Sequence, residues 1–131
     1  NPTLIKYLND AKYSFNSYTM NQTSLVCGVE AVKDDAYFKE TRAKIVATRE
    51  RIKKELSQLG FTFPDSKANF IFASHKEVPA EELFLALRAA DIYVRHWNKE
   101  RIANSLRITV GTDEEMDRLI AFLKEYLEKR A

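Results

Sequence analysis

Residues 105–111 (SLRITVG), which run directly into Thr112, constrain the fold more than any other part of the chain. Apolar and polar residues alternate along this stretch, which is typical of a strand with one buried face. Arg107 lies in the middle of the polar set. Thr112 and Glu115 have the spacing of a capping box, in which a hydroxyl and a carboxylate satisfy the free amide groups at a helix start. The sequence therefore predicts a strand that carries an arginine, ends at Gly111 and is followed at once by a helix.

Arg107 has two interpretations. Its guanidinium group matches a carboxylate or a phosphate in two parallel hydrogen bonds, and its neighbours are small. Alternatively, it is a surface arginine in an ordinary ion pair. Arg95 lies twelve residues earlier, on the preceding predicted strand. If these strands are neighbours, both guanidinium groups face one cavity. Since neither strand carries an acid, and unless acids from elsewhere intervene, the pair favours a dianionic ligand.

The order of the predicted elements indicates the fold class. We expect a short helix that opens at Asn1, an irregular connector at 13–18, a helix at 22–32 with Leu25, Val26 and Val29 facing inward, and a long helix at about 36–59. Strands are expected at 61–63, 69–74, 92–97 and 105–110, with helices at about 79–90 and 113–128. This order predicts an α+β fold. A small, largely antiparallel sheet would have helices packed on one side and be preceded by a long linker helix.

Composition narrows the possible functions. With 131 residues, 45% apolar and 31% charged, the chain has the size and composition of one soluble globular domain. Its net charge of +2 is too small to predict a nucleic-acid or anionic-membrane surface, and no apolar run approaches the roughly 20 residues of a membrane span. Cys27 is the single cysteine, which favours a reducing compartment. The first residue is Asn1 rather than methionine, so we expect a piece of a longer protein.

Familiar catalytic and metal-binding signatures are missing from the sequence. His75 and His96 are far apart, and no pair of ligands has zinc spacing, so we expect each histidine to be a surface or strand residue. Three glycines cannot build a phosphate loop, and no serine stands in the setting of a nucleophile elbow.

Aromatic residues on the predicted strands leave a second function open. Bases could stack on a sheet face formed by Phe70, Phe72, Tyr93 and Trp97, as in RNA-binding domains. The near-neutral charge favours the interpretation that these rings pack against the helices instead. A freestanding α+β module that binds a nucleotide or single-stranded RNA is therefore the alternative function.

Six motifs in one order resemble a known family. They are 15–18 (FNSY), 37–41 (YFKET), 47–51 (ATRER), 67–70 (KANF), 94–98 (VRHWN) and 106–111 (LRITVG). They resemble the C-terminal part of the histidinol-phosphate aminotransferases, which are fold-type I pyridoxal-phosphate enzymes. The resemblance covers nearly the whole chain, and its most specific part is LRITVGTDEE after a Val-Arg strand.

The resemblance implies roles for three residues. Arg107 matches the arginine that grips the substrate α-carboxylate in such aminotransferases, or a phosphate where the substrate carries one in that place. Arg95 matches a second arginine that helps to bind the phosphate end. Asn69 matches the Asn-Phe start of a strand near the site. These three are the predicted substrate-binding residues.

One departure concerns the cofactor. The stretch 66–68 (SKA) superficially resembles the family's Schiff-base lysine motif, but no glycine- and arginine-rich run follows it, and a strand of the small-domain type comes next. Lys67 is therefore rejected as the cofactor lysine. The aspartate that pairs with the pyridine nitrogen and the loop for the cofactor phosphate are also missing. We expect that this chain neither binds pyridoxal phosphate firmly nor transaminates alone.

The resemblance also implies a domain organisation. Residues 1–33 would be the end of the large domain and linker helices, and residues 34–131 the small, C-terminal domain. Pyridoxal phosphate would belong to the full-length enzyme, a cytoplasmic homodimer acting on a small amino or keto acid, with no nucleic-acid or membrane partner. The amino donor, whether histidinol phosphate or an aromatic or other amino acid, stays open.

Overall fold

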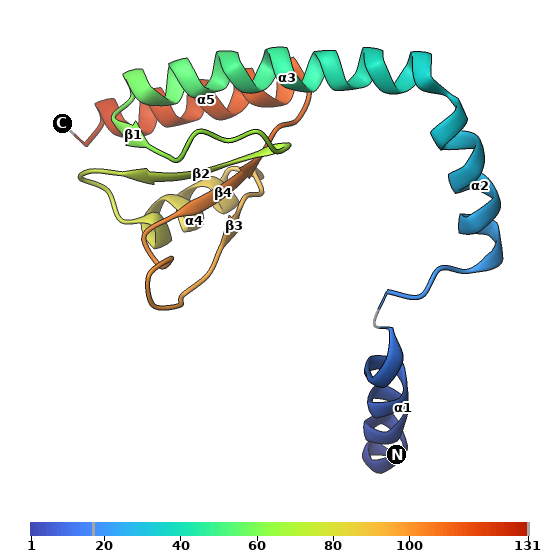
Figure 1. The fold of residues 1–131 in the computed structure, drawn as a ribbon. Coiled ribbons are helices and arrows are strands. Elements are labelled where there is room, and N and C mark those ends of the chain that lie inside the picture. Colours follow the sequence, from blue (N-terminus) through green and yellow to red (C-terminus); the bar gives the residue numbers. More distant parts are fainter. Residues whose placement is uncertain (17, 131) are drawn as a thin grey trace. The chain divides into compact units, whose positions relative to one another are not determined.

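The computed structural model describes residues 1–16 and 18–130 and divides the chain into two compact units, Asn1–Lys39 and Glu40–Ala131. The boundary falls inside the long helix α3 (Asp35–Gln58), which begins one residue before its predicted start (Figure 1). Each unit has its own organisation.

The first unit contains α1 (Pro2–Phe15) and α2 (Gln22–Lys33). As predicted, α1 opens at Asn1, whose side-chain oxygen accepts a hydrogen bond from the amide of Thr3 at 2.9 Å. The expected start of an irregular connector at residue 13 is wrong. No glycine or proline interrupts the chain there, so the helix runs on to Phe15.

The inward-facing side of α2 is a second correction. Leu25, Val26 and Val29 do share one side of the helix, but they are 48%, 58% and 54% exposed. The helical spacing was therefore recognised correctly, while the burial was not. Among the described residues of this unit, nothing covers that side.

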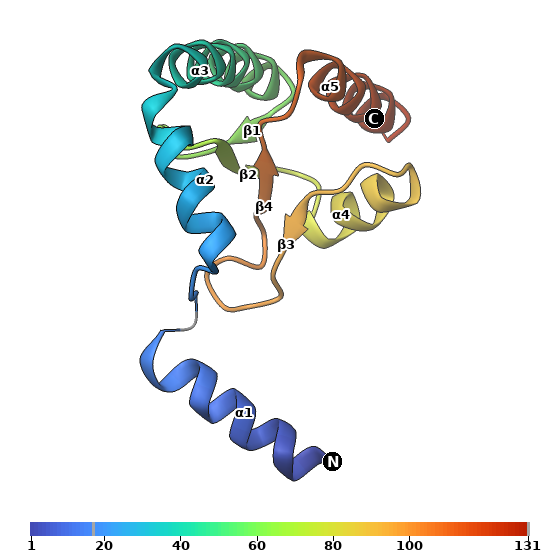
Figure 2. The same ribbon diagram turned by 90° about the vertical axis from the view of Figure 1, so that its right-hand side faces the viewer.

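The second unit is built on a four-stranded antiparallel sheet, so the predicted α+β class is confirmed. Its strands are β1 (Phe61–Thr62), β2 (Phe70–His75), β3 (Arg95–His96) and β4 (Leu106–Thr109). Their spatial order is β1-β2-β4-β3, which can be followed from top to bottom in Figure 2. Strand β3 is shorter than the expected 92–97. The reason lies at the exit of the preceding helix, where Asp91 adopts φ 55° and the Ile92 amide donates to the Leu87 carbonyl at 2.9 Å.

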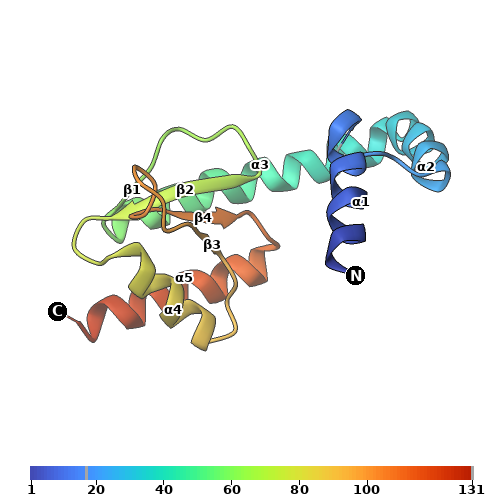
Figure 3. The same cartoon turned by 90° about the horizontal axis from the view of Figure 1, so that it is seen from below.

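Three helices share one core with the sheet: α3, α4 (Ala80–Ala89) and α5 (Asp113–Glu128). Figure 1 shows α3 running beside α5, and Figure 3 shows α4 beside α5. The core side of the sheet is formed by alternate strand residues, Ile71 and Ala73 on β2 and Leu106 and Ile108 on β4. Phe61 of β1 belongs to the same core, and His75 of β2 is buried beside it. The residues that alternate with the buried ones on β2 and β4 face away from this core.

The junction between β4 and α5 has the predicted capping box. The Thr112 amide donates to the Glu115 carboxylate at 2.8 Å, and the Glu115 amide donates to the Thr112 hydroxyl. Gly111 permits this arrangement, because a Cβ at that position would lie 2.3 Å from the Glu115 carboxylate. The strand that carries Arg107 is thereby joined to α5 by a connection of three residues, 110–112.

Candidate anion-binding site

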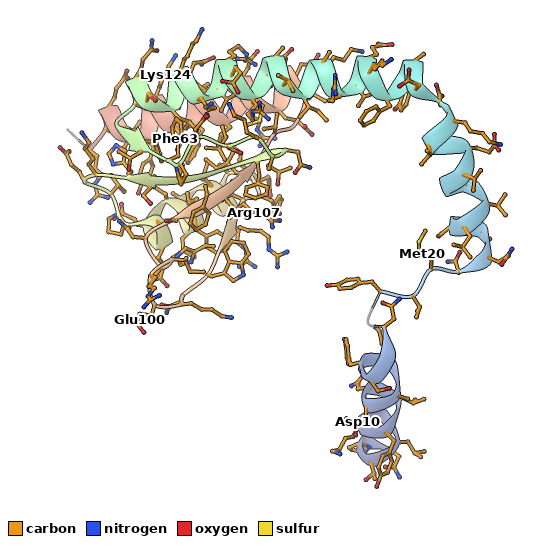
Figure 4. All side chains as sticks on the ribbon, viewed as in Figure 1. Asp10, Met20, Phe63, Glu100, Arg107 and Lys124 are labelled. Carbon is orange, nitrogen blue, oxygen red and sulfur yellow. The ribbon has the colours of Figure 1, made fainter. Side chains whose placement is uncertain are left out.

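The strand register brings the two predicted arginines together. Strands β3 and β4 are antiparallel neighbours, and Arg95 is the direct partner of Arg107. On the other side of β4, Phe72 of β2 is the partner of Arg107. Residues directly opposite each other in a sheet project from the same face, with Cβ atoms about 5 Å apart. The condition set by the sequence, that the arginine strands be neighbours, is therefore met, and Arg107 can be located on β4 in Figure 4.

Aromatic rings flank both guanidinium groups. The guanidinium carbon of Arg107 lies 5.3 Å from the centre of the Phe70 ring and 5.5 Å from that of Trp97. The guanidinium carbon of Arg95 lies 5.3 Å from the Trp97 ring. These distances are within the range of cation–π attraction.

Acidic side chains do not pair with the two arginines. Among residues 1–16 and 18–130, no carboxylate forms an ion pair with Arg95 or Arg107. The Nε of Arg107 is buried and has no hydrogen-bond partner in this part of the chain. A buried donor without a partner is rare and costly, which makes Arg107 a candidate for a role other than packing. The ordinary-ion-pair interpretation of Arg107 is thus not what the structure shows.

Asn69 lies immediately before β2 and is exposed. Its carbonyl accepts a hydrogen bond from the Val110 amide at 2.8 Å, which extends the pairing of β2 with β4 by one residue. The next residue, Phe70, is the ring beside Arg107. Asn69 is therefore the sequence neighbour of the residue whose ring contacts Arg107. In the described part of the chain its side chain makes no hydrogen bond to either arginine.

The interpretation that the strand aromatics pack against the helices is wrong for these positions. Phe70 and Phe72 alternate with the buried residues of β2 and so lie on the face away from the core. Trp97 contacts the arginines, and Tyr93 is 77% exposed. Sequence reasoning missed the contact of Trp97 with the two arginines, although the signal was present. Trp97 follows Arg95 by two residues, and such residues share a face along a strand.

Both histidines are strand residues, as expected. His75, in β2, accepts hydrogen bonds at Nδ1 from the amides of Glu77 and Val78, while Nε2 lies 2.9 Å from the Leu59 carbonyl. The Nε2 of His96, in β3, lies 2.7 Å from the Ala103 carbonyl oxygen, at hydrogen-bonding distance. No cluster of potential metal ligands occurs within the described ranges.

Lys67 has the surroundings of a surface residue. Its side chain is 76% exposed, and its amine lies 2.9 Å from the Asp65 carboxylate. Asp65 is paired with Lys53 as well, and these two lysines, Lys53 first, lower the pKa of Asp65 to about 2. An exposed, ion-paired amine does not fit a cofactor that must be held in a water-excluded site. That Lys67 is not the cofactor lysine stays a prediction.

No helix in the described residues has the length and the apolar character needed to cross a bilayer.

Known proteins resemble this chain in sequence and in fold. The histidinol-phosphate aminotransferase of Brachyspira hyodysenteriae is 50% identical over 124 residues, which is 95% of this chain and 35% of that protein. The crystal structure of the histidinol-phosphate aminotransferase from Clostridium acetobutylicum matches with a TM-score of 0.77 at 22% identity, over 90% of this chain and 36% of that chain. The histidinol-phosphate aminotransferase from Sinorhizobium meliloti, solved in complex with pyridoxal-5'-phosphate, matches with a TM-score of 0.73 at 24% identity. The match covers 93% of this chain and 34% of that chain.

These comparisons confirm the resemblance that the motifs carried, and they do not support the RNA-binding alternative. At such identities the two solved structures show the fold alone. The chain spans about a third of the length of the curated relatives that it matches. The family model for "Aminotransferase class I and II" matches residues 1–123 of this chain. The chain therefore belongs to the class I and II aminotransferase family.

Proposed function

We propose that this chain forms part of an aminotransferase of the histidinol-phosphate type, in which Arg107 and Arg95 bind the anionic group of the substrate. The observation that carries this proposal is the cross-strand arginine pair, which has no acidic partner in the described residues and leaves the Arg107 Nε unbonded. Two adjacent guanidinium groups suit a dianion better than a single carboxylate, because each can donate two parallel hydrogen bonds. A phosphate monoester is the substrate group that fits best.

The domain assignment follows from the same resemblance. In the proposed enzyme, residues 1–33 complete the large domain and provide linker helices, and residues 34–131 form the small domain. Asn69 would border the substrate beside Phe70. The whole enzyme is proposed to be a cytoplasmic homodimer. Light scattering of the purified full-length protein would test the dimeric state.

The chemistry of amino-group transfer would be supplied by pyridoxal phosphate, which acts as an electron sink when bound to the whole enzyme. Lys67, which is exposed and paired with Asp65, is not proposed to hold that group. The part proposed for this chain is to orient the substrate. Arg107 and Arg95 would fix the anionic end, so that the amine is presented in one geometry to the rest of the site.

Substitution of Arg107 in the full-length enzyme tests the proposal. We expect Arg107→Ala to lower kcat/KM for histidinol phosphate by roughly 30- to 1,000-fold, because a charge-assisted pair worth about 2–4 kcal/mol is lost. Absorbance of the bound cofactor should not change. The matched control is Arg88→Ala, an exposed arginine in the last turn of α4, which should retain normal kinetics.

The substrate class is tested by comparing histidinol phosphate with histidinol and phenylalanine. A preference for the phosphorylated amine that disappears in Arg107→Ala would support phosphate recognition by this pair. Equal kcat/KM values for wild type and Arg107→Ala would contradict the proposal.

A further inference from the structure

The pairing of Arg95 with Arg107 creates an electrostatic problem. The two residues are direct cross-strand partners, and like charges directly opposite each other destabilise a sheet. No described carboxylate neutralises either of them. Without another constraint, two long cationic side chains would turn away from each other into water. The pair would then not be ready for a ligand.

Trp97 occupies the position that resolves this problem. Its ring centre lies 5.3 Å from the Arg95 guanidinium carbon and 5.5 Å from that of Arg107, so one indole contacts both cations. Its backbone is fixed just beyond β3, where the Trp97 carbonyl accepts a hydrogen bond from the Lys99 amide at 2.9 Å. Phe70 contacts Arg107 at 5.3 Å from the adjoining part of the sheet. Arg107 therefore has an aromatic neighbour on each of two strand segments.

We propose that Trp97 is the positioning residue of the arginine pair, and that its indole ring holds both guanidinium groups in place for an anionic phosphate ester. This proposal rests on the proposed function and adds a residue to it. An aromatic face attracts a cation without accepting its N–H hydrogen bonds, whereas a carboxylate would occupy those donors. The unbonded Nε of Arg107 agrees with this difference. Trp97 thus favours the clustered arrangement without accepting the hydrogen bonds of the guanidinium donors.

The sequence offers a direct probe, because Trp97 is the single tryptophan of the 131-residue chain. The chain is titrated with inorganic phosphate. Tryptophan fluorescence then reports binding at Trp97, and the Nε–H resonances in NMR spectra report binding at the arginines. We expect a saturable change in both signals that is lost in Arg107→Ala. In the free protein, the Nε–H resonances of Arg95 and Arg107 should carry the ring-current shift of the indole.

Three variants separate positioning from simple packing. Trp97→Leu should weaken phosphate binding about tenfold, measured by NMR, and should abolish the ring-current shift of the Arg95 Nε–H. Trp97→Phe, which keeps an aromatic face, should recover affinity to within about threefold of wild type. The matched control is Tyr93→Leu, which removes an exposed aromatic ring from the same segment and should leave phosphate affinity unchanged.

Fluorinated tryptophan keeps the test informative if Trp97→Leu does not fold. Substitution with mono-, di- and trifluorotryptophan withdraws electron density from the indole face with little change in shape. Phosphate affinity should then fall stepwise with each added fluorine, several-fold over the series.

The outcomes distinguish this inference from the proposed function. If wild type binds phosphate, but Trp97→Leu or the fluorinated series binds it equally well, Trp97 has no positioning role and the arginine site stands. If wild type and Arg107→Ala both fail to respond to phosphate, the arginine site is wrong. In that case the ring-current shifts alone decide whether Trp97 orders the arginines, and their absence would overturn the inference.

Discussion

The basic side chains of α3 and those of the β3–β4 pair are held by opposite kinds of partner. On α3, each of three basic residues contacts carboxylates. These contacts are Arg49 with Glu50, Arg51 with Glu55, Asp113 and Asp117, and Lys53 with Glu50 and Asp65. On the sheet, Arg95 and Arg107 contact the rings of Trp97 and Phe70.

This difference separates basic residues that stabilise the fold from those that can bind a ligand. Hydrogen bonds from Arg51 to Asp113 and Asp117 raise its pKa and tie α3 to α5, so its donors are already in use. The Arg107 Nε has no such partner in the described residues. Removal of an α3 residue should therefore reduce stability, whereas removal of a sheet arginine should reduce binding.

The largest loss of stability is expected for Arg49→Met. The Arg49 side chain is 7% exposed, bonds to Glu50 and donates to the Ala68 carbonyl at 3.1 Å. Methionine fills much of the space but leaves that carbonyl unsatisfied, so we expect a loss of about 2–3 kcal/mol in the free energy of unfolding. Urea denaturation followed by circular dichroism measures it. A loss of unfolding free energy below about 0.5 kcal/mol would mean that Arg49 does not stabilise the fold, and would contradict the distinction drawn for α3.

Arg51→Met should have a smaller effect. Arg51 is 35% exposed, and solvent and salt screen its pairs with Asp113 and Asp117, which are mostly exposed. We expect a loss of about 1 kcal/mol in low salt that shrinks as salt is added. Lys54→Met, at an exposed position of the same helix, serves as the control and should be close to neutral. A loss that does not depend on salt would mean that packing, not charge, is responsible.

Arg107→Met should hardly change stability in the absence of an anion. Its like-charged neighbour Arg95 is relieved of repulsion, while the aromatic contacts of the side chain are partly retained by methionine. We expect a change within about 0.5 kcal/mol of wild type, and a slight gain is possible in low salt. Added phosphate should stabilise wild type and not the variant. A large loss without phosphate would place Arg107 among the scaffold residues.

The smallest expected effect is on the pKa of Asp65, which tests the ion pairs of Lys53 and Lys67. Lys53, and then Lys67, lower the pKa of Asp65 to about 2, below its usual value near 3.8. A lowered pKa in the folded state contributes stability that is present above about pH 4 and is lost as the pH falls toward 2. NMR titration of the carboxyl carbon should show a midpoint near 2 that rises in Lys53→Met and rises less in Lys67→Met. An unchanged midpoint in Lys53→Met would refute the assigned cause.

Sequence reasoning succeeded where local signals agree. The β4–α5 junction was predicted closely because residue alternation, Gly111 and the capping box all indicate the same boundary. It failed at the exit of α4. Asp91 adopts the left-handed conformation that usually marks a glycine or asparagine after a helix, and the Ile92 amide bonds back to the Leu87 carbonyl, so the strand begins later than its apolar residues indicate.

The candidate site was predictable in part. Arg107 was identified from its strand, but its pairing with Arg95 remained conditional, because the register between β3 and β4 depends on the whole sheet. Trp97 was considered only as one of several rings for stacking bases. Its contact with both arginines depends on which face of the sheet the helices leave uncovered, and alternation along one strand does not settle that.

The strand order makes the two arginines mechanically unequal. Strand β4 is bonded on both sides, to β2 and β3, whereas β3 is a two-residue edge strand bonded only to β4 within the described sheet. Arg107 is therefore on an inner strand that is fixed from both sides, and Arg95 is on an edge strand that can move more easily. Anions of different width would be accommodated by displacement of Arg95, while the contact with Arg107 keeps its place.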